Sequence, residues 1–166
     1  MIIAAAQLTI TAMIGRLLLI LALTQVRGDT PDLHKNLGTC KWYNETLEPA
    51  YPCGAHGYAL ELGHHFCLRY EKLNDLLSPK GQQFVLKAKT CLQVELIKGL
   101  YDGISCDDLM TNAFATHVTC YSEDGYCDLG FRDIMAVFDI VGPILQYKFW
   151  STIDTFAEIV GRCWFK

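Results

Sequence analysis

The segment from Tyr51 to Cys67 gathers three of the chain's five histidines, His56, His64 and His65. A neutral imidazole can act as a general base or bind zinc, so this cluster is a candidate for chemistry. Adjacent residues of a helix point to different sides, so only one of His64 and His65 can face His56. The neighbouring cysteines are better used in disulfides than as zinc ligands. We therefore expect partly buried or surface histidines here, with no metal ion and no cofactor.

The same segment invites an enzyme interpretation. Residues 53–57 resemble the calcium-binding loop of secreted phospholipases A2, and His64 or His65 could serve as their water-activating base. The match fails in two places. Phe66 follows His65 where that family has a calcium-binding aspartate, and only six residues separate Gly57 from His64. A calcium-dependent phospholipase A2-like enzyme is therefore the alternative, and a nonenzymatic protein with no catalytic residues is the preferred hypothesis.

Three other groups with catalytic potential have structural explanations. Asp107 and Asp108 follow Ser105, and acids at a helix start stabilise the helix dipole. Glu123 and Asp124 lie in a predicted turn and make a weak calcium site by themselves. His117 falls on the cysteine-bearing face of its predicted helix, which indicates a core histidine.

All eight cysteines lie beyond residue 28, and their even number indicates four disulfides in an oxidising compartment. The sequon Asn44-Glu45-Thr46 agrees with that compartment, because an N-linked glycan is added only along the secretory route. We therefore predict a secreted, extracellular glycoprotein with disulfides among these cysteines: Cys40, Cys53, Cys67, Cys91, Cys106, Cys120, Cys127 and Cys163.

Residues 1–28 have the pattern of a signal peptide. Arg16 precedes the apolar run Leu17–Leu23, which is too short to span a bilayer, and a cut before Asp29 follows small residues. Met13 is an alternative start. Residues 1–28 hold two arginines and no acid, so removing them changes the formal charge from −4 to −6. That charge gives no attraction to nucleic acid or anionic membranes, and we expect no membrane span after cleavage.

The rest of the chain predicts an all-α fold, a small bundle of about five helices linked by disulfides. Residues 29–52 contain three of the five prolines and predict an irregular N-terminal arm before a helical domain at residues 53–166. Apolar residues then recur at three- and four-residue steps, and no segment alternates long enough for a sheet. The five expected helices cover about residues 60–73, 79–101, 106–120, 131–141 and 143–162.

The last two expected helices have wide apolar stripes. We predict that Phe138 points inward from residues 131–141, and that Ile153 and Val160 do so from the last helix. Tyr147, Trp150 and Ala157 lie off the main apolar stripe of that helix and form a second apolar edge. This edge leaves two alternatives open, a noncovalent homodimer or packing beneath the N-terminal arm.

Cys120 and Cys127 could bond to each other or reach different helices. Cys120 ends one expected helix and Cys127 precedes another, so the turn between them lets the two sulfurs point apart. A bridge closing about thirty residues stabilises a fold by roughly 3–4 kcal/mol, more than a short loop does. Long-range bridges are therefore favoured, although a local one remains an alternative.

From Cys67 onward the cysteine spacings are 24, 15, 14, 7 and 36 residues. This series, with Lys80–Val85, Thr90-Cys91-Leu92 and Cys120-Tyr121-Ser122, resembles the stanniocalcins, which are secreted glycoprotein hormones. The similarity runs from about Cys53 to Cys163. It implies disulfide-linked helices and hormone activity in calcium and phosphate balance, exerted by binding an extracellular receptor or target protein. A venom or effector protein that reuses the scaffold is a further alternative.

The resemblance also implies the disulfide pairs. They are Cys40–Cys67, Cys53–Cys106, Cys91–Cys120 and Cys127–Cys163. Asn44 falls near the family's glycan but in a different local motif. The chain lacks one N-terminal cystine and the C-terminal cysteine that links two chains in the family, so the resemblance does not imply a covalent dimer.

Overall fold

A computed structural model describes residues 31–146 and 149–164, which belong to one compact unit, Asp32–Lys166. The expected signal peptide lies outside the described residues. Every regular element within the described ranges is helical, which confirms the all-α, disulfide-linked fold. The α-helices are α2 (Glu48–Ala50), α3 (His65–Lys72), α4 (Pro79–Lys98), α5 (Cys106–Asp124), α6 (Phe131–Val141) and α7 (Phe149–Trp164). The π-helical turns are η1 (Trp42–Leu47) and η2 (Tyr58–His64), and the 3-10 turns are η3 (Asn74–Leu76), η4 (Tyr126–Asp128) and η5 (Gly142–Gln146).

The ends of the long helices follow the local sequence. Ser78 caps α4 by accepting a hydrogen bond from the Gly81 N–H at 3.2 Å, and Pro79 occupies the first turn. Ser105 caps α5 in the same way, through the Asp108 N–H at 3.0 Å. Gly125 ends α5 with a φ of 105°, a conformation that costs glycine little. These features confirm the expected starts of α4 and α5, whereas α5 continues through Ser122–Asp124, where the sequence predicts a turn.

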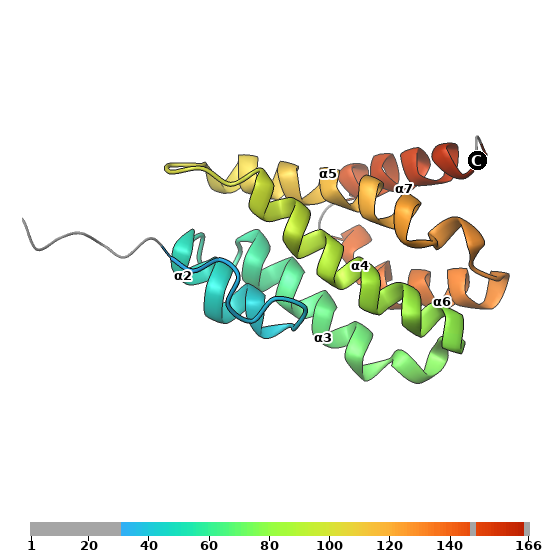
Figure 1. Ribbon diagram of the computed structural model, residues 1–166. Helices are drawn as coiled ribbons and strands as arrows, with labels where there is room; N and C mark the ends of the chain where they lie inside the picture. Colours follow the sequence, from blue (N-terminus) through green and yellow to red (C-terminus); the bar gives the residue numbers. More distant parts are fainter. Residues whose placement is uncertain (1–30, 147–148, 165–166) are drawn as a thin grey trace, which may run out of the picture. The chain divides into compact units, whose positions relative to one another are not determined.

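The helices pack along one another in two layers. Figure 1 shows α4 beside α5, and α7 alongside α5, whereas α3 contacts α6 on the other side of the unit. The buried residues form two neighbouring cores. One core centres on η1, η2 and the first half of α5. The other core is formed by the first half of α4, the second half of α5, and helices α6 and α7. Long helices α4 and α5 contribute to both cores and join them.

The N-terminal arm is helical from Trp42 to Ala50, so the expectation of an irregular segment is wrong there, whereas residues 31–40 form turns and irregular backbone. Its η1 turn places Trp42 and Leu47 in the first core, where neither is exposed. Gly63 of η2 lies so close to η1 that a Cβ atom there would stand 2.4 Å from the Tyr43 ring. The arm is thus part of the helical domain, because burial of its aromatic residues outweighs the weak helix preference of its sequence.

One expected helix is continuous and another is interrupted. The expected helix at residues 60–73 runs without a break from Tyr58 to Lys72, as η2 followed by α3. The segment from Pro143 is the 3-10 turn η5 and then α7, with residues 147–148 outside the described part. Proline at position 143 lacks an N–H donor and does not continue the helix geometry of α6, which accounts for the change there.

Polar contacts fix α6 against α3 and α4. The Arg69 Nε donates to the Ile140 carbonyl at 2.8 Å, where the end of α6 leaves carbonyl groups without helical partners. At the other end of α6, the buried Asp133 carboxylate accepts from the Ser78 N–H at 2.7 Å and the Ser78 hydroxyl at 2.6 Å. Gly81 leaves room for this carboxylate, since a Cβ atom there would lie 2.7 Å from Asp133 Oδ1.

Helices α6 and α7 are rotated relative to the prediction. Phe138, Ile153 and Val160 are each about 40% exposed, whereas Thr152 and Ile159 are buried. Their apolar stripes are wider than one core face can cover, so the pattern alone did not define which edge points inward. The disulfide from Cys163 to Cys127 ties α7 to the turn before α6 and helps to set its rotation.

Four disulfides connect the described elements: Cys40–Cys67, Cys53–Cys106, Cys91–Cys120 and Cys127–Cys163. They are the same pairs that the resemblance implies. Their sequence separations are 53 residues for Cys53–Cys106 and between 27 and 36 for the others. In the chain-entropy model, loops of this size each stabilise the fold by about 3–4 kcal/mol.

Candidate functional site

The histidines of the segment Tyr51–Cys67 face different surroundings. His56 is exposed, and its Nδ1 lies 3.5 Å from the Glu61 carboxylate. His64 is half-buried in η2, while His65 is exposed and packs the edge of its ring against Phe66 at 5.0 Å between centroids. The structure therefore does not bring the three imidazoles into one group.

Residues 53–57, which resemble the phospholipase calcium loop in sequence, form a tight turn that is closed by its own backbone. The Gly57 N–H donates to the Gly54 carbonyl at 2.9 Å, and a Cβ at Gly57 would collide with the Cys53 side chain. The Glu48 carboxylate accepts from the N–H groups of Cys53 and Gly54 at 3.1 and 2.7 Å. The loop thus presents N–H groups to a carboxylate, and no observation here favours the phospholipase alternative.

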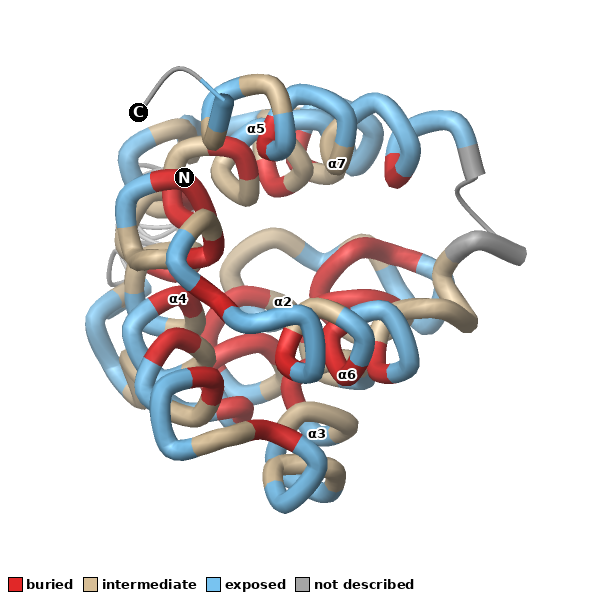
Figure 2. Tube along the Cα trace, turned by 90° about the vertical axis from the view of Figure 1, so that its right-hand side faces the viewer, coloured by how far each residue is buried: buried red, intermediate tan, exposed pale blue. Residues whose placement is uncertain are grey.

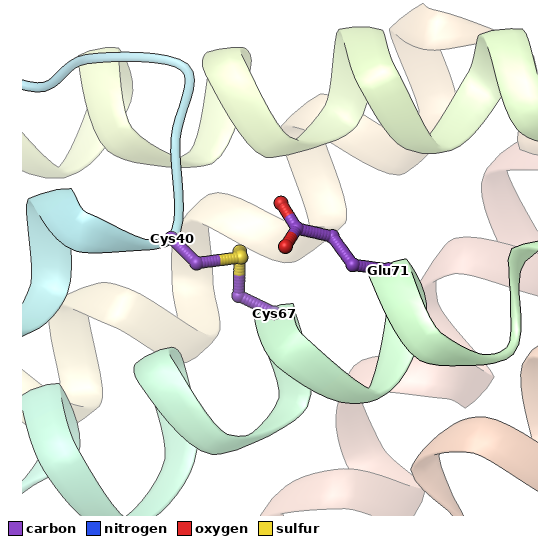
Figure 3. A group of neighbouring side chains, drawn as sticks. All are labelled: Cys40, Cys67 and Glu71. Carbon is purple, nitrogen blue, oxygen red and sulfur yellow. A yellow bond between two sulfur atoms is a disulfide. The ribbon is translucent and has the colours of Figure 1, made fainter.

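Two groups of side chains in the described ranges have metal-ligating atoms close together. They are Cys40, Cys67 and Glu71, shown in Figure 3, and Cys91, Cys120 and Asp124. Figure 3 shows the two sulfurs of the first group bonded to each other, with Glu71 one turn further along α3. A disulfide sulfur is not a thiolate, so each group offers a metal one carboxylate only. Neither group is a metal site while its disulfide is intact.

The acidic pairs have structural roles. Asp108 accepts a hydrogen bond from the Ser105 hydroxyl at 2.7 Å, and Asp107 lies in the same first turn of α5. At the other end of α5, burial raises the pKa of the Asp124 carboxyl, while Lys87 opposes this shift. The Oδ2 atom of Asp124 is buried without a hydrogen-bond partner.

Asn44 lies in η1 and is half-buried, with its Oδ1 buried and unpartnered. The hydroxyl of Thr46, the third residue of the sequon, is already engaged. It donates to the Lys35 carbonyl at 2.9 Å. Glycosylation of Asn44 therefore stays a prediction, and the sugar would have to be added before this turn packs.

An apolar groove lies between α6 and α7. We call it the α6/α7 groove, and its volume is about 570 Å³. Figure 2 shows that the outward side of α7 is exposed along its length. Phe138 of α6 stacks on Phe156 of α7 at 5.0 Å between centroids, and Trp164 is 83% exposed at one end. The lining residues are Phe138, Val141, Thr152, Ile153, Phe156, Ala157, Val160, Gly161 and Trp164.

Ala157, one member of the second apolar edge that the sequence indicates on α7, lines the groove. Trp150 is 75% exposed and Ala157 is exposed, so these two residues do not pack beneath the N-terminal arm. Tyr147, the third member of that edge, lies outside the described residues. Sequence reasoning missed Ile153 and Val160 as surface residues, although their spacing with Ala157 and Trp164 is the 3–4 repeat of a helix-binding seam.

No family model matches the chain, and comparison with curated proteins and with solved structures finds no match. Four disulfides are consistent with an extracellular protein. Among the helices of the described residues, none is long and apolar enough to cross a membrane.

Proposed function

We propose that this chain is a secreted, nonenzymatic signalling protein of the stanniocalcin-like kind, and that it acts by binding an extracellular protein. The observation that carries the proposal is the exposed α6/α7 groove. Exposed apolar surface that is continuous rather than scattered marks interaction sites. The agreement between the four disulfides and the pairs implied by the resemblance supports the hormone-like scaffold.

The occupant of the groove is an amphipathic helix of the partner protein. Ile153, Ala157, Val160 and Trp164 follow a 3–4 spacing along α7, which is the pattern that accepts the apolar face of one helix. Gly161 borders open space in the groove, since a Cβ there would meet nothing within 4 Å.

The charges around the groove define the partner further. Asp139 and Asp154 are exposed beside it, and the Arg162 guanidinium is already paired with Glu158 at 3.1 Å. The segment after residue 28 carries a net formal charge of −6. A partner helix with lysine or arginine beside its apolar face complements this rim, whereas a second copy of the chain would bring like charges together.

A photocrosslinking experiment tests this proposal. A photoreactive amino acid at Val160 of the secreted protein should crosslink to one extracellular protein, through a helix with basic flanks. Purified partner should then bind Trp164→Ala at least about tenfold more weakly than the parent, as expected for a buried aromatic anchor. Tyr101→Ala, at an aromatic residue 55% exposed outside the groove, is the matched control and should bind as the parent does.

A second copy of the chain in the α6/α7 groove would give a different experimental result. If sedimentation shows a homodimer that Val160→Asp dissociates, the groove is an interface between two copies and the proposed partner is wrong. Equal binding by the parent, Trp164→Ala and Val160→Asp would also reject the groove as the binding surface.

A further inference from the structure

A second cavity, partly open to solvent, lies within the helical unit, and His117 is part of its wall. Its volume is about 340 Å³, and most of its lining residues come from η2, α3, α4, α5 and α7. Ligand pockets of folded proteins begin at roughly 300 Å³. An apolar cavity of about 150 Å³ holds benzene, so this one can hold a molecule with roughly twice as many non-hydrogen atoms.

The wall of the cavity is mainly aromatic and aliphatic. Phe66 contributes to it from α3, Phe84 and Leu92 from α4, and Phe114 from α5. Transfer of an apolar ligand from water to such a wall is favourable by about 25 cal/mol per Å² of buried apolar surface. The cavity therefore suits a ligand that is apolar over most of its surface.

The charged groups of the wall neutralise one another. Glu71 and Lys89 both line the cavity, and the Lys89 Nζ lies 3.4 Å from Glu71 Oε1. A carboxylate or an ammonium ion entering the cavity would have to be desolvated without an available counterion. An uncharged ligand meets no such cost.

The tyrosines of the wall stay neutral and largely satisfied. The hydroxyl groups of Tyr70 and Tyr121 face each other at 3.5 Å. Burial raises the pKa of Tyr43 to about 12, and burial raises the pKa of Tyr58 well above its ordinary value. None of these four residues adds charge to the cavity at physiological pH.

His117 supplies one directed hydrogen-bond acceptor. Its Nδ1 lies 2.8 Å from the Ala113 carbonyl oxygen, which can only accept, so Nδ1 carries the proton. Desolvation lowers the pKa of His117, which keeps the ring neutral. In this tautomer Nε2 has a lone pair and no proton, and the ring lines the cavity between Phe114 and Tyr121. An O–H group in the cavity can therefore donate to Nε2.

We propose that this cavity is a binding site for a small, uncharged, mostly apolar molecule that carries one hydroxyl group, with the hydroxyl donating to His117 Nε2. The class comprises aliphatic and alicyclic alcohols of roughly ten non-hydrogen atoms. The site is separate in function from the α6/α7 groove, although Val141, Thr152 and Phe156 line both.

Calorimetric titration of the secreted, disulfide-bonded protein tests the ligand class. The probes are 1-octanol, its isomer methyl heptyl ether, which has no O–H donor, and octanoate, which is charged. We expect saturable one-to-one binding of 1-octanol, with the ether about 2- to 10-fold weaker because one neutral hydrogen bond is lost. Octanoate should bind more weakly than either. Absence of saturable 1-octanol binding, or octanoate binding as tightly as 1-octanol, would overturn the proposal.

Two kinds of variant locate the binding. His117→Phe keeps an aromatic ring without the acceptor, so it should remove the difference between 1-octanol and the ether. Ala88→Leu and Leu92→Trp place extra atoms in the cavity from α4, and each should abolish binding in a protein that still melts cooperatively. Trp164→Ala alters only the α6/α7 groove and should bind 1-octanol as the parent does. Loss of binding in Trp164→Ala with retention in both filled variants would place the ligand in the groove and reject the cavity.

Discussion

Gln93 is a fully buried polar residue that holds the N-terminal arm against α4. Its Oε1 accepts from the Gly38 N–H at 2.6 Å, and its Nε2 donates to the Thr39 carbonyl at 2.9 Å. Gln93→Leu leaves both part-buried backbone groups without their partners, so we expect a loss of about 2–4 kcal/mol in the free energy of unfolding. Urea denaturation measures it. Gln83→Leu, at an exposed position of the same helix, should change stability by less than about 0.5 kcal/mol.

His117 makes the stability of the fold depend on pH. Desolvation lowers its folded-state pKa from the ordinary 6.5, and the hydrogen bond to the Ala113 carbonyl opposes this shift only in part. The unfolded chain therefore binds a proton more readily than the folded chain below pH 6.5. The contribution of neutral His117 to the free energy of unfolding is fully present above that pH. It is lost as the pH drops toward the lowered pKa, by at most about 1.4 kcal/mol per pH unit for one group.

The variant His117→Gln isolates this effect. The other ionisable groups that line the cavity, namely Tyr43, Tyr58, Tyr70, Glu71, Lys89 and Tyr121, are present in both proteins. Urea denaturation at pH 7, 6 and 5 should show the parent losing more stability than the variant. Parallel curves for the two proteins would mean that His117 takes up a proton equally well in the folded state.

Asn44 tests passage through the secretory route. Expressed with residues 1–28 in a eukaryotic cell, the protein should appear in the medium carrying one N-linked glycan. Asn44→Gln should lose the mass of that glycan and retain the thermal midpoint of the deglycosylated parent, because the Asn44 side chain makes no hydrogen bond through its Oδ1. The readout is the intact mass before and after enzymatic deglycosylation. A parent that differs in mass from the variant only by the extra methylene of glutamine would show that the sequon is unused.

At the scale of the helix, Asp133 couples the start of α6 to the start of α4. Its carboxylate accepts two hydrogen bonds from Ser78, the residue that caps α4. Asp133→Ala should lower the free energy of unfolding by about 2–3 kcal/mol, because it removes two charge-assisted hydrogen bonds and leaves the part-buried Ser78 N–H without a partner. Thermal and urea denaturation measure this cost. Asp139→Ala, on the exposed side of α6, is the matched control, and equal effects of the two substitutions would contradict the coupling.

The sequence predicts the long helices well, because their signals are local. Ser78 and Ser105 cap α4 and α5, and Phe84, Ala88 and Leu96 mark the buried face of α4. The helical arm was missed because three prolines suggest a loop, whereas Trp42 is held by long-range packing that no local pattern encodes.

The rotation of α6 and α7 was missed for a related reason. Both helices are apolar over more than one face, so several rotations satisfy the sequence pattern equally well. Phe138 and Val160 were expected inside, yet they line the exposed groove that forms the candidate binding surface. The cavity was also invisible in the sequence, since its wall comes mostly from five elements that meet only in the fold.

At the scale of the whole molecule, disulfides join segments that sequence order keeps apart. Helix geometry left open whether Cys120 bonds locally to Cys127, and the resemblance was needed to imply the four pairs. In the structure Cys120 bonds Cys91 across the α4–α5 contact, and Cys127 bonds Cys163 of α7. The two cysteines at the ends of one short turn therefore brace different parts of the bundle.

Removing the Cys91–Cys120 bridge should destabilise the molecule without changing its other pairs. The double variant Cys91→Ala, Cys120→Ala removes the bridge that joins residues 29 positions apart, so the unfolded chain gains conformational entropy. We expect the free energy of unfolding to fall by about 3–4 kcal/mol. Cys120 is fully buried between two helices, so the lost packing adds to this cost. Urea denaturation measures the loss, and a nonreducing peptide map by mass spectrometry should still join Cys127 to Cys163. A parent map that joins Cys120 to Cys127 would instead contradict both the pairing and the stanniocalcin-like scaffold, and unchanged stability of the double variant would show that the α4–α5 contact persists in the unfolded chain.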